Sequence, residues 1–553
     1  MAIDEALEKT FLQELEALEK FRISYTGLHQ NLPLDREDPD VRRLIEALGF
    51  FTARTRLASE RSLTDSLLRM FRQHFPYVLS PMPPMAMLRG ATTARFVDPV
   101  EIPVHTEVGL DDKSSRGSGA VYRFRTLAPL RLFPIELVGA HTLVTRGKGA
   151  RIVLLFESPF PRNDDLGELA LHVNHLNDLY ASQLVLYALK THLRRVTLVT
   201  EKSVKADTPG EPCQVRLGAI AKDGRDLDVL EHPVQRFRAF VQLPQAELYL
   251  NVSGLRLGRN WQSFALCLDV DEDWPADLKI TADTFELHTV PMINLRRDLS
   301  DPIECDGTKE RYSVHHPESF AGYAVHSVVG VYSSGDKGMV PIAPTVLGGA
   351  QDGYDVLFEG EADRRRCWLS LSLQDAFEKP RRVAVEAFFY QPGIAKIAVD
   401  TLRVRLFDRH VEGIDWQLSG SLSPPQGNAL ERDRDGLLAL LSIKNQRFVG
   451  TDDLRFLLRS LGVHERREFA RIVSALSNVH VRSRPSAKSA GGLCHVYELT
   501  FEELTVSDLP RLDPFCSKLL DLLAVWSVEQ VVAIVAKVPR LGKELSYPSN
   551  GRS

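Results

Sequence analysis

Cysteines are few in this sequence, and none lies near another. The six cysteines, at positions 213, 267, 305, 367, 494 and 516, are each at least twenty residues from the next. This scatter contains no C-x-x-C or zinc-finger spacing, and a secreted disulfide framework would group its cysteines more closely. We therefore expect reduced cysteines in the core and no metal or other cofactor.

Long apolar runs are also absent. Apolar runs such as 522–526 are far shorter than the roughly 20 residues that a bilayer crossing requires. The opening residues MAIDE lack the charged-then-apolar order of a secretory signal peptide. We expect a soluble, cytoplasmic protein without direct membrane insertion.

The sequence has no excess of basic residues. Its 68 Lys and Arg residues against 73 Asp and Glu residues give a net charge of -5, whereas phosphate binding normally requires a basic domain. The short basic clusters at 194–195, 364–366, 381–382 and 466–467 mostly have Asp or Glu close by. They fit a solvated surface or a protein interface, so we expect no nucleic acid partner.

Motifs of the common enzyme classes are missing as well. The sequence has no G-x-x-x-x-G-K-[ST], H-E-x-x-H or G-x-S-x-G motif, and no G-x-G-x-x-G between a strand and a helix. His172 and His175 are three residues apart, with Asp178 nearby, so on a helix the two imidazoles could bind one metal ion. No third ligand is marked, and we favour a solvated junction. A triad of Ser182, His192 and Asp178 lacks a feature that would form an oxyanion hole. We expect no enzyme, and no catalytic or metal-binding residues.

Helical periodicity covers the first part of the chain. One face of the first predicted helix carries apolar residues at spacings of four and three, namely Leu7, Phe11, Leu15 and Leu18. A second helix is predicted to begin at Pro39 with Asp38 as its cap, and a third to end before Pro76. Their apolar faces consist of Val41, Leu44, Ile45, Leu48 and Phe51, and of Leu67, Leu68, Phe71 and Phe75.

Strand periodicity follows from about Met85 to Gly420, in short segments bounded by Gly, Pro, Asp or Asn. One break, between Leu176 and Leu189, has the apolar spacing of an inserted amphipathic helix. Helices then return, followed by a strand at 494–501 and a strongly apolar stretch at 515–538 that we interpret as one long helix.

These patterns predict an α+β fold with distinct parts along the chain. We expect a helical N-terminal region at 1–84 and a long antiparallel β-rich body at 85–420. The body consists of one or two β subdomains with an inserted helix, the first at 85–200 and the second at 201–420. A mixed α/β C-terminal domain is expected at 421–553.

One phrase of the β body has the chemistry of an architectural corner. In HTVPMINL at 288–295, followed by DPI at 301–303, Pro291 cannot donate a hydrogen bond to a sheet and Asn294 can bond to nearby backbone. Pro302 then starts the next extended segment. We interpret Pro291, Asn294, Leu295 and Pro302 as the place where a strand leaves a sheet.

The same phrase and others resemble one protein family over most of the chain. The others are DPDVRRLIEA at 38–47 with FFTAR at 50–54, the proline-rich FPYVLSPMPPM at 75–85, and GLLALLSIKN at 436–445. In this order they resemble the TssF family, also called ImpG or VasA, of bacterial type VI secretion baseplates. Phe11-Leu12 stands in place of paired tyrosines, and Arg296 in place of an aromatic residue after Leu295, which indicates a divergent member.

The resemblance implies a structural wedge subunit of a cytoplasmic baseplate at the inner face of the inner membrane. Its implied partners are a TssG-like subunit, a second TssF copy, a TssK adaptor and a TssE-like sheath linker. Leu7, Phe11, Leu15 and Leu18 would then join an intermolecular helical bundle, or else pack on the second helix of their own chain, since the same face fits both. A wedge protein of a phage-like or extracellular contractile injection particle is the alternative, and a β-rich hydrolase or carbohydrate-binding protein is a remote one.

Overall fold

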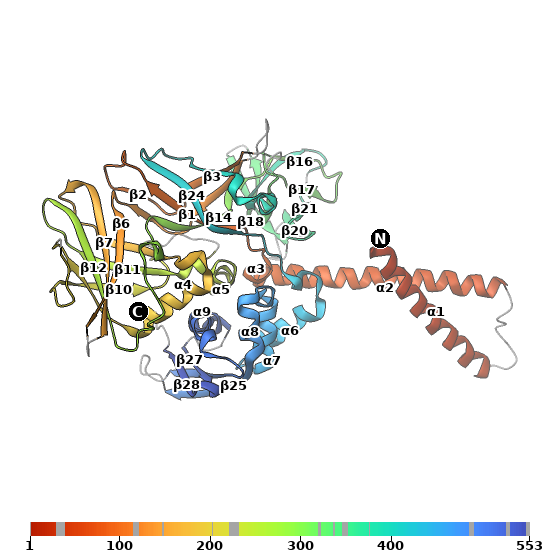
Figure 1. Cartoon of the computed structure of the whole chain (residues 1–553). Coiled ribbons are helices and arrows are strands. Elements are labelled where there is room, and N and C mark those ends of the chain that lie inside the picture. The colour runs from red at the N-terminus through yellow and green to blue at the C-terminus, as the bar shows by residue number, and fades with distance from the viewer. Residues whose placement is uncertain are drawn as a thin grey trace. The chain divides into compact units, whose positions relative to one another are not determined.

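The computed structural model of the chain is shown in Figure 1. It describes residues 2–28, 39–113, 121–145, 149–201, 203–220, 230, 232–318, 322–335, 338–345, 352–374, 376–485, 492–526 and 531–548. The chain divides into two compact units. The first consists of Met1–Pro76 with Leu430–Ala439, and the second of Tyr77–Ala429 with Leu440–Ser553.

The first unit is built on two long helices, α1 (Ala2–Leu28) and α2 (Pro39–His74). The prediction of separate second and third helices is wrong, because α2 runs through both. The intervening sequence, 52–66, has no Pro or Gly and is rich in residues that favour helices, so its weaker apolar pattern does not end the helix. Asp38, the expected cap, lies outside the described residues.

The second unit contains the β body, which starts after the short helix α3 (Pro76–Leu79) and is organised around a first sheet. Its strand order is β23-β3-β4-β14-β1-β24, and all of its pairs are antiparallel. These strands are β1 (Met85–Thr92), β3 (Glu107–Asp112), β4 (Val121–Thr126), β14 (Thr289–Ile293), β23 (Leu402–Leu406) and β24 (Ile414–Ser423). A separate two-stranded sheet consists of β2 (Val100–Ile102) and β5 (Leu130–Leu132), which precede β3 and follow β4 in the sequence.

A second antiparallel sheet is inserted between β5 and β14. Its order is β13-β8-β11-β10-β9-β12-β7-β6. The strands are β6 (Glu136–Thr145), β7 (Gly149–Arg162), β8 (Gly167–Val173), β9 (Leu193–Val199), β10 (Glu211–Leu217), β11 (Tyr249–Leu255), β12 (Trp261–Val270) and β13 (Phe285–Glu286). The inserted helix expected near 176–189 is α4 (Leu179–His192), which begins where the Asp178 carboxylate accepts a hydrogen bond from the Ala181 N–H.

A third sheet is inserted between β14 and β23. Its order is β15-β22-β18-β19-β20-β21-β17, with β16 also paired to β22. The strands are β15 (Arg296–Leu299), β16 (Ile303–Cys305), β17 (Tyr312–Ser313), β18 (Ala324–Gly335), β19 (Gly338–Pro344), β20 (Gly353–Glu359), β21 (Arg366–Ser372) and β22 (Arg381–Tyr390). Its pairs are antiparallel except β19 with β20.

The C-terminal part combines helices with a separate sheet of order β25-β26-β27-β28. Its helices are α6 (Arg434–Asn445), α7 (Thr451–Ser460), α8 (Arg467–Ala475) and α9 (Leu509–Trp526), and its strands are β25 (Leu476–Pro485), β26 (Leu493–Phe501), β27 (Val532–Val538) and β28 (Lys543–Tyr547). The predicted long helix at 515–538 is therefore wrong in its second half. Residues 532–538, VAIVAKV, are rich in β-branched side chains and pair in parallel with β26.

The second and third sheets are inserted into the chain of the first sheet, and the predicted corner lies where the chain leaves β14 of the first sheet for β15 of the third. The first sheet takes strands from three separate stretches, and each insertion leaves it and returns. The expected boundary between residues 200 and 201 falls between β9 and β10, which pair in one sheet. The chain therefore does not separate into two β subdomains at that position.

The helix α5 (Pro233–Gln242) belongs to the second unit and lies between β10 and β11 in the chain. His232 caps it through its ring and stacks on Tyr77 at 3.5 Å between ring centroids. Burial, together with the charges of Arg236 and Lys444, lowers the pKa of His232 to about 4.

Candidate functional site

The apolar stripe predicted on the first helix lies partly against α2. Leu7, Phe11, Leu15 and Leu18 are half-buried. The Phe11 and Phe50 rings meet edge to face at 6.4 Å between centroids. Gly49 allows the close approach, because a Cβ atom there would lie 3.1 Å from Leu15 Cδ2.

A second apolar stripe of the helical pair is exposed to solvent. Leu44, Leu48 and Phe51 are 71%, 51% and 65% exposed, and we call them the outer stripe. At 100° per residue they lie on the side of α2 opposite Gly49 and Ala53, which are buried. Further large apolar side chains of the pair are exposed at Leu12, Phe21, Ile23, Leu28 and Leu63. Two helices alone leave this much apolar surface uncovered, which is typical of an interaction site.

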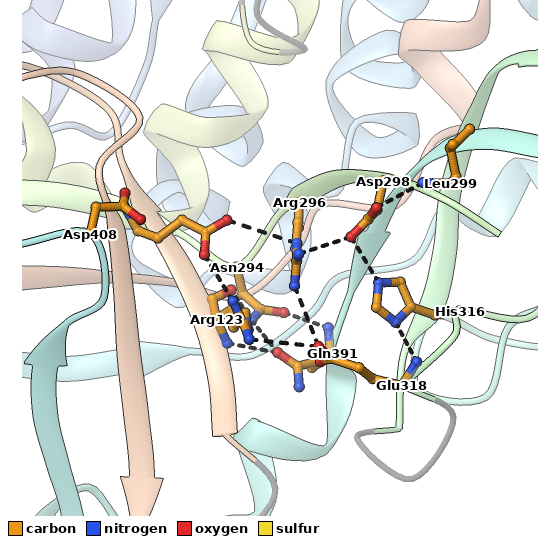
Figure 2. Close-up of polar contacts among 10 residues, drawn as sticks. Arg123, Asn294, Arg296, Asp298, Leu299, His316, Glu318, Gln391 and Asp408 are labelled. Carbon is orange, nitrogen blue, oxygen red and sulfur yellow. Dashed lines mark hydrogen bonds and ion pairs between the residues drawn. The ribbon is translucent and has the colours of Figure 1, made fainter. Parts of the chain in front are cut away.

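The predicted corner is a buried hydrogen-bonded junction between the first and third sheets (Figure 2). Asn294, 1% exposed, donates from its backbone N–H to Pro84 O at 2.8 Å and from Nδ2 to Arg123 O at 2.8 Å. Its Oδ1 accepts the Gln391 N–H. The Gln391 side chain in turn accepts the Arg123 N–H at 2.7 Å and donates to Val121 O at 2.9 Å.

The remaining corner residues occupy different surroundings. Leu295 is buried in a cluster with Met85, Leu243 and Tyr390, which come from the first sheet, the segment after α5 and the third sheet. Pro291 lies inside β14 opposite Met87, and its carbonyl accepts the Leu127 N–H at 2.8 Å. Pro302 is exposed and directly precedes β16.

An ionic network lies beside the Asn294–Gln391 junction (Figure 2). Arg123 pairs with Glu107 at 3.0 Å and with Glu318 at 3.6 Å. Arg296 pairs with Asp298 at 3.0 Å, and more distantly with Glu107 at 3.8 Å and Glu318 at 3.9 Å. Burial lowers the pKa of Arg296, but the carboxylates of Asp298 and Glu107 outweigh it and raise the pKa overall. The arginine that replaces an aromatic residue after Leu295 therefore links β3 and β15.

A second polar junction, which the sequence did not indicate, ties the first sheet to the second. The buried Glu286 carboxylate accepts hydrogen bonds from Arg89 at 3.1 Å, Asn174 at 2.9 Å and Ser419 at 2.8 Å, and its Oε2 lies 3.4 Å from His172 Nδ1. A lone Glu in an otherwise apolar strand has no motif that would mark it. These four partners occupy the carboxylate oxygens, so Glu286 does not present a free ligand for a cation.

The other sequence candidates are not brought together as a site. His172 Nε2 lies 3.1 Å from Gln245 O, and His175 Nδ1 lies 3.1 Å from Thr284 Oγ1. His192 Nδ1 is 2.8 Å from Asp271, whereas the Ser182 hydroxyl donates to the Asp178 carbonyl. Within the described part of the chain, no group of three or more His, Cys, Asp or Glu residues could hold a metal ion.

Two further expectations concern the cysteines and the membrane. Cys213 is half-buried and the other five cysteines are buried, all of them as free thiols. Burial raises the pKa of Cys267 to about 11, as expected for a core thiol. None of the helices that the structure describes combines the length and apolarity that a bilayer crossing requires.

Comparisons with known proteins give the family. The family profile described as "Type VI secretion system, TssF" matches residues 4–367, which is more than half of the chain. A chain in the cryo-electron microscopy structure of the type VI secretion system TssK-TssF-TssG baseplate subcomplex is similar with a TM-score of 0.74 and 18% identity, over 93% of this chain and 99% of that chain. A chain in the structure of the baseplate complex from the type VI secretion system has a TM-score of 0.58 and 16% identity, over 99% of both chains. The search of curated proteins found no match. The structural likenesses show a shared fold, and the family match shows that this chain belongs to the TssF family of type VI secretion systems.

Proposed function

We propose that this protein is a structural wedge subunit of a type VI secretion baseplate, without catalytic activity. Its family is that of TssF, and a chain of the same fold occurs in a TssK-TssF-TssG baseplate subcomplex. A TssG-like subunit and a TssK adaptor are therefore the first partners to test. A second copy of this chain, a TssE-like sheath linker and a place at the cytoplasmic face of the inner membrane complete the proposal, on the family resemblance.

The outer stripe is the observation that carries the proposal. Leu44, Leu48 and Phe51 face away from α1, so the contacts within the helical pair do not cover them. Covering a large apolar side chain fully is worth about 1.5 to 3 kcal/mol. Helices of a partner laid along α2 would cover the stripe, which is the knobs-into-holes arrangement of a helical bundle.

The stripe of Leu7, Phe11, Leu15 and Leu18 has a supporting role in this proposal. Because Phe11 and Leu15 pack on α2, they hold α1 in place, and their exposed fraction remains available to a third helix. Assembly would thus use both faces named by the sequence, the first mainly for α1–α2 packing and the outer stripe for partner helices.

The experiment is co-expression with the TssG-like subunit, followed by affinity purification and native mass spectrometry. Leu48→Glu should reduce recovery of the complex at least about tenfold, because a carboxylate would be buried in an apolar contact. Ala17→Glu, at an exposed position of α1, adds the same charge as a matched control and should assemble normally. Normal assembly of Leu48→Glu would contradict the outer-stripe interface, and no binding of the wild type to the TssG-like subunit would contradict the proposed function.

A further inference from the structure

The C-terminal sheet ends in an edge strand, β25, whose first half is covered. Among the strands that the structure describes, β25 pairs only with β26. Near its start, the Val479 N–H donates to Thr451 Oγ1 of α7 at 2.9 Å, and Arg455 donates to Leu476 O at 3.0 Å. The helix α7 therefore satisfies the outward backbone groups at the beginning of β25.

The second half of β25 has outward backbone groups that nothing in the described part of the chain meets. Since backbone groups alternate along a strand, Val481 and Ser483 point the same way as Val479, away from β26. The His495 N–H supports this assignment, because it donates to Val531 O at 3.0 Å on the opposite side. Ser483 and His495 are register partners, so theirs is a non-hydrogen-bonded pair. We call the N–H and C=O groups of Val481 and Ser483 the open edge.

The side chains along the open edge are basic. His480, Arg482 and Arg484 alternate on one face of β25 and are exposed. In the sequence, residues 469–497 include Arg471, Arg482, Arg484 and Lys488 but no Asp or Glu, although the whole chain has a net charge of -5. Arg482 lies 3.2 Å from Glu498, whereas Arg484 has no carboxylate partner among the residues that the structure describes.

The charge decides what fits the open edge. Charged side chains on an edge strand prevent two copies of a protein from pairing through it, because like charges would face each other. A second copy of this chain is therefore excluded as the occupant. We propose that the open edge of β25 binds an extended, acidic segment of another protein, which adds to the C-terminal sheet as a further strand. Its main chain would bond to Val481 and Ser483, and its Asp or Glu side chains would meet Arg482 and Arg484.

This inference does not depend on the helical pair, since it concerns a different unit of the chain. Its probe is a labelled peptide that alternates Glu with Val, titrated into the full chain and followed by fluorescence anisotropy. Val481→Pro removes an outward N–H that the sheet does not use, and should weaken binding at least about tenfold. Val481→Thr keeps the N–H and the β-branched shape, and should bind within about twofold of wild type.

Further arms separate main-chain pairing from simple charge attraction. A peptide N-methylated at alternate residues keeps its charge but loses half of its donors, so it should bind weakly to the unaltered protein, which removes any dependence on variant folding. The double variant Arg482→Glu and Arg484→Glu should also lose binding, and so should a Lys-for-Glu peptide. Equal binding of the N-methylated peptide, equal binding of Val481→Pro, or comparable binding of a single-stranded DNA oligonucleotide would each overturn the proposal.

Discussion

Replacing Glu286 with Gln should destabilise the junction between the first and second sheets at neutral pH. The carboxylate lies between β13 and the first sheet, where it accepts hydrogen bonds from Arg89 and Ser419 of that sheet. On its other side it meets Asn174 and His172. Gln keeps the shape of the side chain, but it loses the negative charge and offers an NH₂ group to partners that are themselves donors.

The size of the effect follows from the pKa of Glu286. Burial would raise this pKa, but the hydrogen bonds from His172, Asn174 and Ser419 outweigh it and lower the pKa from 4.5 to about 2. At about 1.4 kcal/mol for each tenfold change in proton affinity, the lowered pKa is worth about 3 kcal/mol of stability. A carboxyl group with a lowered folded-state pKa stabilises the fold in full above its unfolded pKa. This contribution is lost as the pH falls from about 4.5 to about 2.

The assay is urea unfolding of the full chain followed by circular dichroism, at pH values between 7 and 3. At pH 7, Glu286→Gln should unfold with a free energy about 2 to 3 kcal/mol below wild type, and the difference should shrink as the pH falls. Glu304→Gln is the matched control, because the Glu304 side chain is 80% exposed and lies 3.8 Å from Arg382. It should change stability by less than about 0.5 kcal/mol. A difference between Glu286→Gln and wild type that stays constant with pH would refute the reasoning.

Two further changes test the corner and the helical pair. Asn294→Ala should lower the free energy of unfolding by about 2 to 4 kcal/mol, because the Gln391 N–H and the Arg123 carbonyl would lose a buried partner. Urea unfolding measures this change. A loss below about 1 kcal/mol would contradict the stabilising role of the Asn294 junction. Gly49→Val should separate α1 from α2, because even a Cβ atom added at this position would lie 3.1 Å from Leu15 Cδ2. Faster proteolysis of α1 is expected, and unchanged cleavage would contradict the packing.

Local patterns in the sequence predicted the elements better than the sheets. The strands β7, β12 and β22 lie within 85–420, where the alternation of apolar residues predicted strands. Their partners come from distant stretches, as where Met85 of β1 pairs with both Ile293 and Ser423. Alternating apolar residues indicate that a strand is half-buried, but they do not indicate which strand lies next to it.

The failure at the C-terminus has a related cause. A strongly apolar stretch such as 519–538 fits a buried helix and a buried strand equally well, so periodicity alone does not separate them. The structure places a helix up to Trp526 and a strand from Val532. The β-branched residues after 530 were the available signal.

The sequence indicated some of the residues at the polar junctions but not others. Asn294 was identifiable because it follows a proline inside a strand and its short amide side chain suits a corner. Its partner Gln391 and the buried Glu286 were not, because their importance comes only from groups that are distant in sequence. The outer stripe was visible as an apolar helix face, but only the position of Gly49 against α1 shows which side of α2 remains uncovered.

The most direct test of the wedge proposal is a cryo-electron microscopy reconstruction of this chain co-expressed with its TssG-like subunit. We expect one complex in which Leu44, Leu48 and Phe51 are buried against helices of another chain. A complex in which these three side chains face solvent, or a chain that stays alone in the presence of the TssG-like subunit, would contradict it.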